Sequence, residues 1–250
     1  MGEKIKKKLG GLVFSVLVLT VCWTLAAVAL NKPMLPTPLA VFERMPELFL
    51  EDEGLKHLGA SLLRIMTGLI LSLFFGFLLG VLMGRKSWAN RLFDPIIYLT
   101  YPVPKLALLP ILMVLFGLGE ESKLFLILLI IFPQVVLAVR DAVKAIPNNL
   151  YDIYHGLRAT RLQCFTHITL PASVYALLSA SRVSLGIAIS VLFFAETYGT
   201  TWGMGYFIMD AWQRLDYPAM YGAVVLLSTL GLVLFLVIDA IGYLVMKWER

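Results

Sequence analysis

The chain has 250 residues, of which 60% are hydrophobic and only 15% charged, whereas a soluble domain is nearer half apolar and a quarter charged. Apolar runs of about 20 residues recur, long enough to cross a ~30 Å hydrocarbon core as helices. The net charge of +5 lies in short clusters between these runs, as expected for cations that flank membrane spans. The composition therefore excludes a soluble nucleic-acid-binding protein and predicts an all-α protein embedded in the lipid bilayer.

The apolar runs predict six transmembrane helices in a single domain, residues 1–250. The first run is longer than the roughly 7–15-residue core of a signal peptide, so we expect it to be retained as a span. Pro102, Pro104 and Pro110 lie within the third run and should bend that helix. A five-helix core is expected from about residue 60 to 250. The six predicted spans are residues 10–30, 60–84, 92–117, 123–143, 172–196 and 219–246.

The cations are distributed unevenly between the two sets of loops. One set, which includes both ends of the chain, carries most of the Lys and Arg residues, among them Arg85 and Lys144. The other set contains the acidic stretch ERMPELFLEDEG. Loops rich in Lys and Arg face the cytoplasm. We therefore expect both termini to be cytoplasmic, together with the stretch between the fourth and fifth spans.

That cytoplasmic stretch, residues 145–171, is basic and half-polar. Leu162, Phe165 and Ile168 recur every three residues, so they should lie along one side of a short helix, with two arginines on another side. Such a helix can lie on the lipid surface or fit a groove on a soluble partner. The pattern alone leaves both interpretations open.

The sequence LRATRLQCFTHITLP, residues 157–171, resembles the cytoplasmic signature loop of ABC importer permeases, in which Glu-Ala-Ala is followed by a Gly and then by Ile-x-Leu-Pro. The end of the stretch matches this signature, and Pro171 is expected to open the fifth span at its first turn. In this alignment Asp152 replaces the family's Glu, and Arg158 replaces its Gly. Arg tolerates a positive φ less well than Gly, so Gly156 is the candidate to provide the turn instead.

Longer segments extend the resemblance. Residues 92–123, LFDPIIYLTYPVPKLALLPILMVLFGLGEESK, and the stretches HLGASLLRIMTG and AETYGTTWGMGYFIMDA are similar to permeases for nitrate, sulfonates, taurine and bicarbonate. Permeases for pyrimidine precursors of thiamine and for riboflavin are also similar. The resemblance implies the type I ABC importer permease fold. It also implies a permease homodimer, or one half of a pair, that works with a cytoplasmic ABC ATPase dimer and an extracytoplasmic solute-binding protein.

In these permeases the signature loop is the helix that couples the permease to the ATPase. The chain has no GxxxxGK[ST] phosphate-binding loop, so we do not expect it to be an enzyme, and ATP hydrolysis would reside in the partner subunit. The resemblance assigns ATPase coupling to Asp152, Gly156, Arg158, Arg161, Leu162, Phe165, Ile168, Leu170 and Pro171.

Ionisable side chains near the centre of a span cost roughly 2.5–3.5 kcal/mol each on insertion scales, so each one needs a partner or a role. Lys105 follows Pro104 in the sequence YPVPK. It could face a translocation path that favours anions, or it could stabilise the bent helix. Arg64, near the outer start of the second span, is expected to extend to the membrane surface.

Two further charges lie deep in predicted spans. Arg182 is expected to form a structural pair with an acid such as Asp94 or Asp141. Asp239 is expected to be an interhelical partner, because the many apolar residues of the sixth span offset the cost of one acid.

The outer end of the fifth span is rich in glycine and aromatic residues. Glu196 lies just before TYGTTWGMGY, and glycines such as Gly203 permit close backbone approach. Resemblance would make this segment, with Trp202, part of an outer gate. The alternatives are a headgroup-level acid and a loop of the interfacial aromatic belt.

The expected function is transport of a small solute, with Lys105 and Arg182 favouring an anion such as a sulfonate, taurine or nitrate. A thiamine-precursor pyrimidine or riboflavin is the alternative solute. A secondary transporter is the alternative from another class, although paired intramembrane carboxylates and an inverted repeat are not evident. Cys22 and Cys164 have no metal-ligand spacing, so no metal or cofactor is expected.

Overall fold

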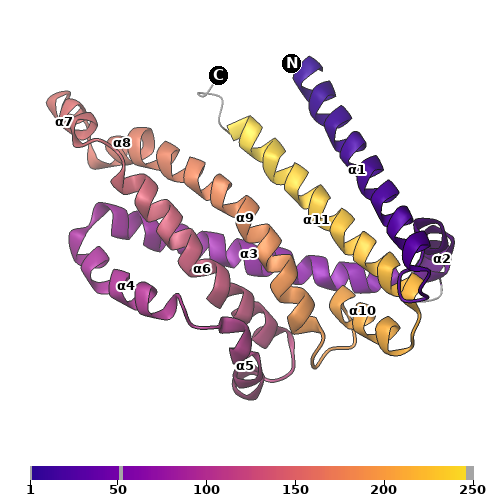
Figure 1. The fold of residues 1–250 in the computed structure, drawn as a ribbon. Helices are drawn as coiled ribbons and strands as arrows, with labels where there is room; N and C mark the ends of the chain where they lie inside the picture. Colours follow the sequence, from indigo (N-terminus) through magenta and orange to yellow (C-terminus); the bar gives the residue numbers. More distant parts are fainter. Residues whose placement is uncertain (1, 51–52, 246–250) are drawn as a thin grey trace.

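The computed structural model describes residues 2–50 and 53–245, and every regular element in these ranges is helical. Figure 1 shows long helices crossing one another, with shorter helices at the two ends of the bundle. The elements are α1 (Gly2–Leu30), α2 (Pro38–Leu50), α3 (Gly54–Arg85), α4 (Ser87–Thr100), η1 (Lys105–Leu108), α5 (Leu109–Phe116), α6 (Glu120–Lys144), α7 (Asn148–Gly156), α8 (Arg161–Cys164), η2 (Phe165–Thr169), α9 (Leu170–Glu196), α10 (Met204–Gln213) and α11 (Tyr217–Val245).

Within the described ranges, five helical segments are long and apolar enough to cross a membrane. They correspond to five of the predicted runs. The run predicted as the third span is instead a bent pair, α4 followed by η1 and α5, with 85° between its two parts. If this bent pair counts as one span, the total rises to six.

The bend in the third run is confirmed, and its cause is local. The chain leaves the helix between Tyr101 and Pro104, because Pro102 and Pro104 have no N–H to donate to a preceding carbonyl. Pro110 does not contribute to the bend, since it lies in the first turn of α5, where a missing N–H costs nothing.

Pro171 lies in the first turn of α9, which begins at Leu170, as predicted, but other helical turns precede α9 without a break. Helical structure is continuous over residues 161–196, through α8, η2 and α9. η2 is a π-helical turn, which widens the helix ahead of Pro171. This widening accommodates the proline ring, which in a regular α-helix would clash with the carbonyl four residues before it.

The core of the bundle is the close pair α3 and α6, with α9 packed against both. Glycines on α3 face branched side chains on α6. A Cβ at Gly76 would lie 2.7 Å from a methyl carbon of Val135, and one at Gly80 would lie 2.8 Å from the Cβ of Val139. The two helix backbones therefore approach closely only because these positions carry no side chain.

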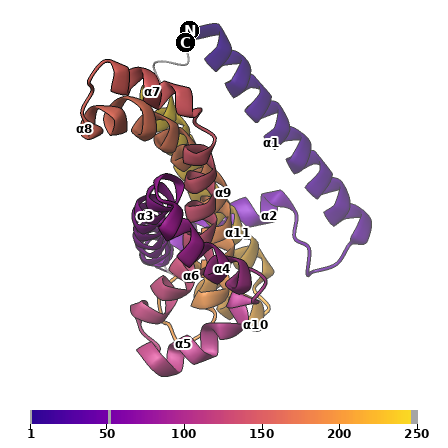
Figure 2. The same cartoon turned by 90° about the vertical axis from the view of Figure 1, so that its left-hand side faces the viewer.

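Helix α1 stands apart from this core (Figure 2). It is attached mainly at its end, where Trp23 Nε1 donates to the Pro36 carbonyl at 3.0 Å and the Trp23 ring packs 5.6 Å from that of Tyr221. Both figures place the start of α1, the end of α11 and helices α7 and α8 at one end of the molecule. Helices α5 and α10 lie at the opposite end.

Candidate functional site

Helix α7 ends in a tight turn centred on Arg158. The Arg158 N–H donates to the His155 carbonyl at 2.9 Å, and the Ala159 N–H donates to the Tyr154 carbonyl at 2.9 Å. These two bonds form a Schellman motif, which requires a left-handed residue at its fifth position. That residue is Arg158, with φ +57°.

The expectation that Gly156 provides the turn is therefore wrong. Gly156 is the last residue of α7 and has no positive φ, whereas Arg158 adopts the left-handed conformation at the position where the signature has Gly. A non-glycine residue in this conformation is strained by roughly 1–2 kcal/mol. The replacement leaves the turn in place and adds strain to it.

After the turn, a capping box starts the next helix. The Thr160 hydroxyl accepts from the Gln163 N–H at 3.3 Å, and the Gln163 side chain accepts from the Thr160 N–H at 2.7 Å. Reciprocal bonds of this kind satisfy two free N–H groups at a helix start. The chain is thereby directed from α7 into the long helical segment of residues 161–196.

Leu162, Phe165 and Ile168, predicted to share one apolar side of a helix, do not share one environment in the structure. Leu162 is 70% exposed and Phe165 is half-buried, but Ile168 is only 9% exposed. Ile168 packs with Tyr151 and Cys164 in a small core that holds α7 against the helical segment. The π turn changes the helical phase, so a spacing of three residues does not keep Ile168 on the side of Leu162.

The other predicted coupling residues differ in exposure. Asp152, Gly156, Arg158 and Arg161 are exposed, while Leu170 and Pro171 are half-buried at the start of α9. Residues 145–171, hereafter the 145–171 segment, therefore present a mixed surface of exposed charged and apolar side chains above a small core of their own.

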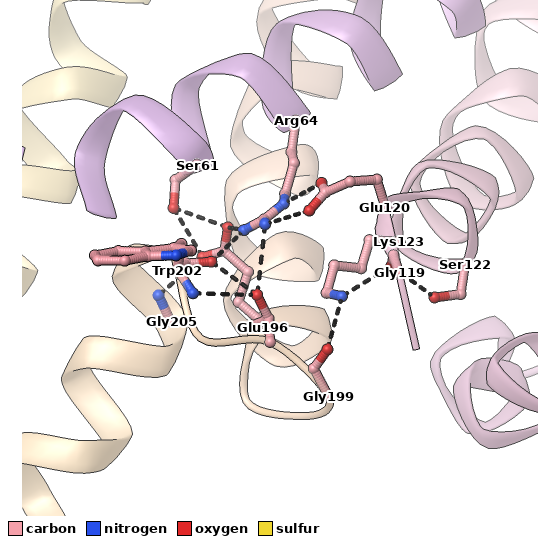
Figure 3. Close-up of polar contacts among 12 residues, drawn as sticks. Ser61, Arg64, Gly119, Glu120, Ser122, Lys123, Glu196, Gly199, Trp202 and Gly205 are labelled. Atoms are coloured by element: carbon pink, nitrogen blue, oxygen red, sulfur yellow. Dashed lines mark hydrogen bonds and ion pairs between the residues drawn. The ribbon is translucent and has the colours of Figure 1, made fainter. Parts of the chain in front are cut away.

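At the opposite end of the bundle, Arg64 is the centre of a buried ionic cluster (Figure 3). Its guanidinium donates to Glu196 at 2.7 Å, to both oxygens of Glu120 at 2.5 Å, and to the Trp202 carbonyl at 2.6 Å. Arg64 is only 5% exposed, so the expectation that it extends to the membrane surface is wrong. A buried guanidinium requires paired carboxylates, and two other helices supply them.

Glu196 is the fully buried carboxylate of this cluster. It accepts from the Ser61 hydroxyl at 2.8 and 2.9 Å and from the Gly205 N–H at 2.9 Å, in addition to Arg64. A Cβ at Gly203 would lie 2.4 Å from the carboxylate carbon. Glycine is therefore required there, and its φ of +141° suits glycine as well. Glu196 is not a headgroup-level acid.

The side chain of Lys123 completes the cluster. It is 1% exposed and donates to the Leu118 and Gly119 carbonyls at 2.9 Å and to the Gly199 carbonyl at 3.4 Å. Two turns, 117–119 and 197–203, are thus held together by one ammonium group. We call Ser61, Arg64, Glu120, Lys123 and Glu196 the Arg64 cluster.

Sequence reasoning brought Glu196, Trp202 and Gly203 together but missed the cations that hold them. A signal was present, because Arg64, Glu120 and Lys123 all lie near predicted span ends of the same side. Two cations and two acids form a neutral set that can be buried together. Only the fold shows that they meet.

Pro104 and Lys105 border a cavity of about 680 Å³ between the broken span and α9. Among the described residues, Lys105 is the only charged one that lines it, and the Lys105 Nζ donates to the Tyr101 carbonyl at 3.2 Å. That carbonyl is one of those freed by the helix break. The other lining residues are Val103, Leu106, Ile130, Val183, Gly186, Ile187, Ser190, Val191 and Phe194.

The expected pair of Arg182 with Asp94 or Asp141 is not formed. Arg182 Nε lies 2.7 Å from the Asp239 carboxylate on α11, an ion pair in distance although not aligned as a hydrogen bond. Asp94 and Asp141 both pair with Arg140 instead. The prediction that Asp239 is an interhelical partner is confirmed.

The long apolar helices, the broken span and the buried ionic cluster define a multi-pass α-helical membrane protein. The family model described as "binding-protein-dependent transport system inner membrane component" matches residues 72–250. The chain belongs to this family, and it is a permease subunit of an ABC importer.

Relatives of known name agree with this assignment. The chain is 33% identical over 237 residues to the taurine transport system permease protein TauC of Escherichia coli, covering 92% of this chain and 86% of TauC. It is 27% identical to the formylaminopyrimidine transport permease protein ThiX of Halalkalibacterium halodurans, covering 94% of each chain. A putative aliphatic sulfonates permease protein, SsuC of Bacillus subtilis, is 29% identical, with 88% of this chain and 80% of SsuC covered.

Solved structures share the fold at lower identity. A bacterial ABC transporter involved in the import of the acidic polysaccharide alginate matches with a TM-score of 0.67 at 17% identity, covering 99% of this chain and 100% of that chain. An inward-facing MetNI methionine ABC transporter matches with a TM-score of 0.60 at 20% identity, covering 81% and 99%.

Proposed function

We propose that this permease carries a small organic or inorganic anion, such as a sulfonate, taurine or nitrate, through the cavity beside the broken span. The observation that carries the proposal is the charge of the cavity wall. Within the part of the chain that the structure describes, Lys105 is the one charged lining residue, and the other lining side chains are apolar apart from Ser190. A low-dielectric wall with one cation favours a small anion that also has an apolar part.

The positive charge of the cavity comes from Lys105 alone. Arg182 is matched by Asp239 and so adds no net charge. Two of the relatives above are named for taurine and for aliphatic sulfonates. These solutes carry a sulfonate group, which supports an anion as the solute of this permease. The formylaminopyrimidine relative makes a thiamine-precursor pyrimidine the second candidate, because a largely apolar cavity also suits a flat heterocycle.

The 145–171 segment is the proposed contact with a cytoplasmic ABC ATPase dimer. Its exposed apolar side chains, Leu157 at 74% and Leu162 at 70% exposure, stand beside Arg158 and Arg161. Apolar anchors ringed by charges are typical of a helix that fits a groove on a soluble partner. A lipid-surface helix is the alternative, and the ATPase is favoured because the chain belongs to a family that works with one.

The proposed orientation places both termini and the 145–171 segment in the cytoplasm, since their end of the molecule carries most of the Lys and Arg residues. The Arg64 cluster then lies on the outer side, where Glu196, Trp202 and Gly203 form an outer gate toward a solute-binding protein. A permease homodimer completes the proposed transporter.

The function is tested by ATP-dependent uptake in proteoliposomes that contain this chain, its ATPase and its binding protein. The solutes are taurine, an alkanesulfonate, nitrate, a formylaminopyrimidine and riboflavin. Uptake of one of the anions supports the proposal. Uptake of the pyrimidine or riboflavin keeps the permease assignment and rejects the anion. Uptake that proceeds without ATP would indicate a secondary transporter.

Removal of the Lys105 charge tests the anion directly. Lys105→Met should lower uptake of the anion by about tenfold or more, because about 1.4 kcal/mol of lost attraction corresponds to a factor of ten. Lys105→Arg, which keeps the charge, is the matched control and should retain most of the uptake. Equal uptake by wild type and Lys105→Met would mean that the cation does not act on the solute.

An apolar anchor of the 145–171 segment can be tested separately. Leu162→Asp should abolish co-purification of the ATPase with the permease, because it places a carboxylate in an apolar groove at a cost of several kcal/mol. Thr166→Asp, on an exposed residue of the same segment, is the control for added charge. Unchanged co-purification of Leu162→Asp would favour the lipid-surface interpretation.

A further inference from the structure

Three helices connect the two candidate sites from end to end. α6 begins and α9 ends at the Arg64 cluster, and α3 contributes Ser61 and Arg64 from its eighth and eleventh residues. The other end of each of these helices lies at the 145–171 segment. No flexible linker interrupts any of the three. The two sites are therefore connected by three continuous helices.

At the cluster end, one side chain joins all three helices. Arg64 projects from α3 and bonds Glu120 in the first turn of α6 and Glu196 in the last turn of α9. Figure 3 shows the guanidinium between the two carboxylates. The same group donates to the Trp202 carbonyl, so it also holds the turn that leads into α10.

At the other end, each helix meets the 145–171 segment differently. The guanidinium of Arg85, the last residue of α3, stacks 4.1 Å from the ring of Tyr151 on α7. α6 leads directly into α7, and α9 is continuous with α8. The Tyr151 hydroxyl lies 3.0 Å from the Thr169 hydroxyl, which ties α7 to the base of α9.

Between the two ends, the helices are packed too closely to slide independently. Branched side chains of α6 occupy the glycine positions of α3, at Gly68, Gly76, Gly80 and Gly84. The central core also includes Leu185, Ala188 and Leu192 of α9, all buried. Close-packed interiors transmit displacement and do not absorb it.

We propose that Arg64 is a positioning residue that links the outer turns of this permease to its 145–171 segment. A partner that displaces residues 197–203 moves Glu196 and Trp202, and Arg64 passes this movement to α3 and α6. Thermodynamic reciprocity requires the reverse effect, so nucleotide binding to the ATPase alters the outer turns. The inference rests on the proposed function, because it takes the ATPase as the partner of the 145–171 segment.

Glu196 is the second half of the link. Its carboxylate holds Ser61 of α3, the Gly205 N–H and Arg64 together. Replacement by Gln keeps the size of the side chain but removes one of the two carboxylate charges that hold Arg64. The link should therefore weaken although the cluster remains filled.

The experiment is hydrogen exchange of residues 197–205 in the assembled permease–ATPase complex, with and without a non-hydrolysable ATP analogue. In the wild-type complex, the analogue should change exchange in this segment by about fivefold or more, the lower end of typical allosteric coupling. Arg64→Met and Glu196→Gln should each lose most of this change. Glu121→Gln, which alters an exposed neighbour of Glu120, is the matched control and should keep it.

Two results would overturn the inference. One is a full nucleotide response in Arg64→Met or Glu196→Gln, and the other is no response in a wild-type complex that transports solute. Arg64→Met removes a buried charge and risks misfolding, so the isosteric Glu196→Gln decides the matter if Arg64→Met does not assemble. Failure of the proposed function is recognised separately, as absence of ATP-driven uptake by the wild-type complex.

Discussion

At the residue scale, the turn after α7 depends on a single unfavourable backbone conformation. Arg158 has φ +57°, and its side chain is exposed. Two backbone hydrogen bonds hold it there, from its own N–H to His155 and from Ala159 to Tyr154. The turn is therefore maintained by hydrogen bonds of the main chain.

Arg158→Gly should leave the turn intact and stabilise it by less than about 1 kcal/mol. Glycine removes a left-handed penalty of roughly 1–2 kcal/mol, but part of this gain is lost because glycine has more conformational freedom in the unfolded chain. Hydrogen exchange at the Ala159 amide, which bonds to Tyr154, measures the change. Arg158→Val should do the opposite, since a β-branched residue fits this conformation poorly.

Faster exchange at Ala159 in Arg158→Gly would mean that the arginine side chain stabilises the turn through a contact. Gly156→Ala serves as the control for helix propensity. Gly156 is helical, and nothing lies within 4 Å of an added Cβ, so alanine should slow exchange in α7.

At the scale of elements, the bundle depends on the contact of α3 with α6. Four glycines of α3 receive side chains of α6, which lets the backbones approach as they do in other membrane helix pairs with small residues at the interface. Such contacts provide the van der Waals packing that holds helices together where lipid is as apolar as the side chains.

Gly80→Ala should lower the stability of the purified permease by about 1–3 kcal/mol, the usual range for overpacking. The new Cβ would lie 2.8 Å from the Val139 Cβ and 2.9 Å from the Val136 carbonyl oxygen, so the helices must separate. Thermal unfolding in detergent measures the effect. Gly59→Ala, on the same helix with nothing within 4 Å, should be neutral or stabilising, and an equal loss in both variants would contradict the packing argument.

At the scale of the whole molecule, the two candidate sites lie at opposite ends of the bundle. The 145–171 segment lies beside the ends of the chain, and the turn of residues 197–203 lies beside α5 and α10. A bilayer that surrounds the long apolar helices must therefore separate the two sites. This separation can be measured without knowledge of the solute.

Single cysteines at exposed residues, Asn149→Cys and Tyr198→Cys, test the orientation in a chain with Cys22→Ser and Cys164→Ser. A membrane-impermeant maleimide should label Tyr198→Cys on intact cells and Asn149→Cys only after permeabilisation, because cation-rich loops remain in the cytoplasm. The cysteine-free chain, which must still support uptake, is the control. Labelling in the reverse order would invert the proposed topology.

Much of the fold could be predicted, because a membrane span is recognised from the hydropathy of its own residues. Five of the predicted runs contain single long helices, and the bend of the third follows from Pro102 and Pro104. Pro171, a helix-start signal, lies in the first turn of α9 as predicted, but the π turn that joins α9 to the helix before it was not predicted.

The candidate site was predicted less completely, for a reason of distance along the chain. Arg64 bonds Glu120 and Glu196, which lie 56 and 132 positions further along the chain. Arg140 bonds Asp94 across 46 positions. A sequence shows that a charge in a span needs a partner, but it does not show which of several acids is near. The Arg182 pair was assigned to the wrong acid for this reason.

By itself, the sequence determined that this is a multi-pass helical membrane protein of a permease family and that residues 145–171 differ from the spans. The membrane class follows from composition and local pattern, and the permease family follows from the resemblance of sequence motifs to known permeases; neither needs contacts. Only the tertiary structure decided which charges neutralise one another, that Arg158 rather than Gly156 adopts the left-handed turn, and that Lys105 is the charged residue of the cavity. These depend on which helices lie side by side, and that is set by close packing of side chains far apart in the chain.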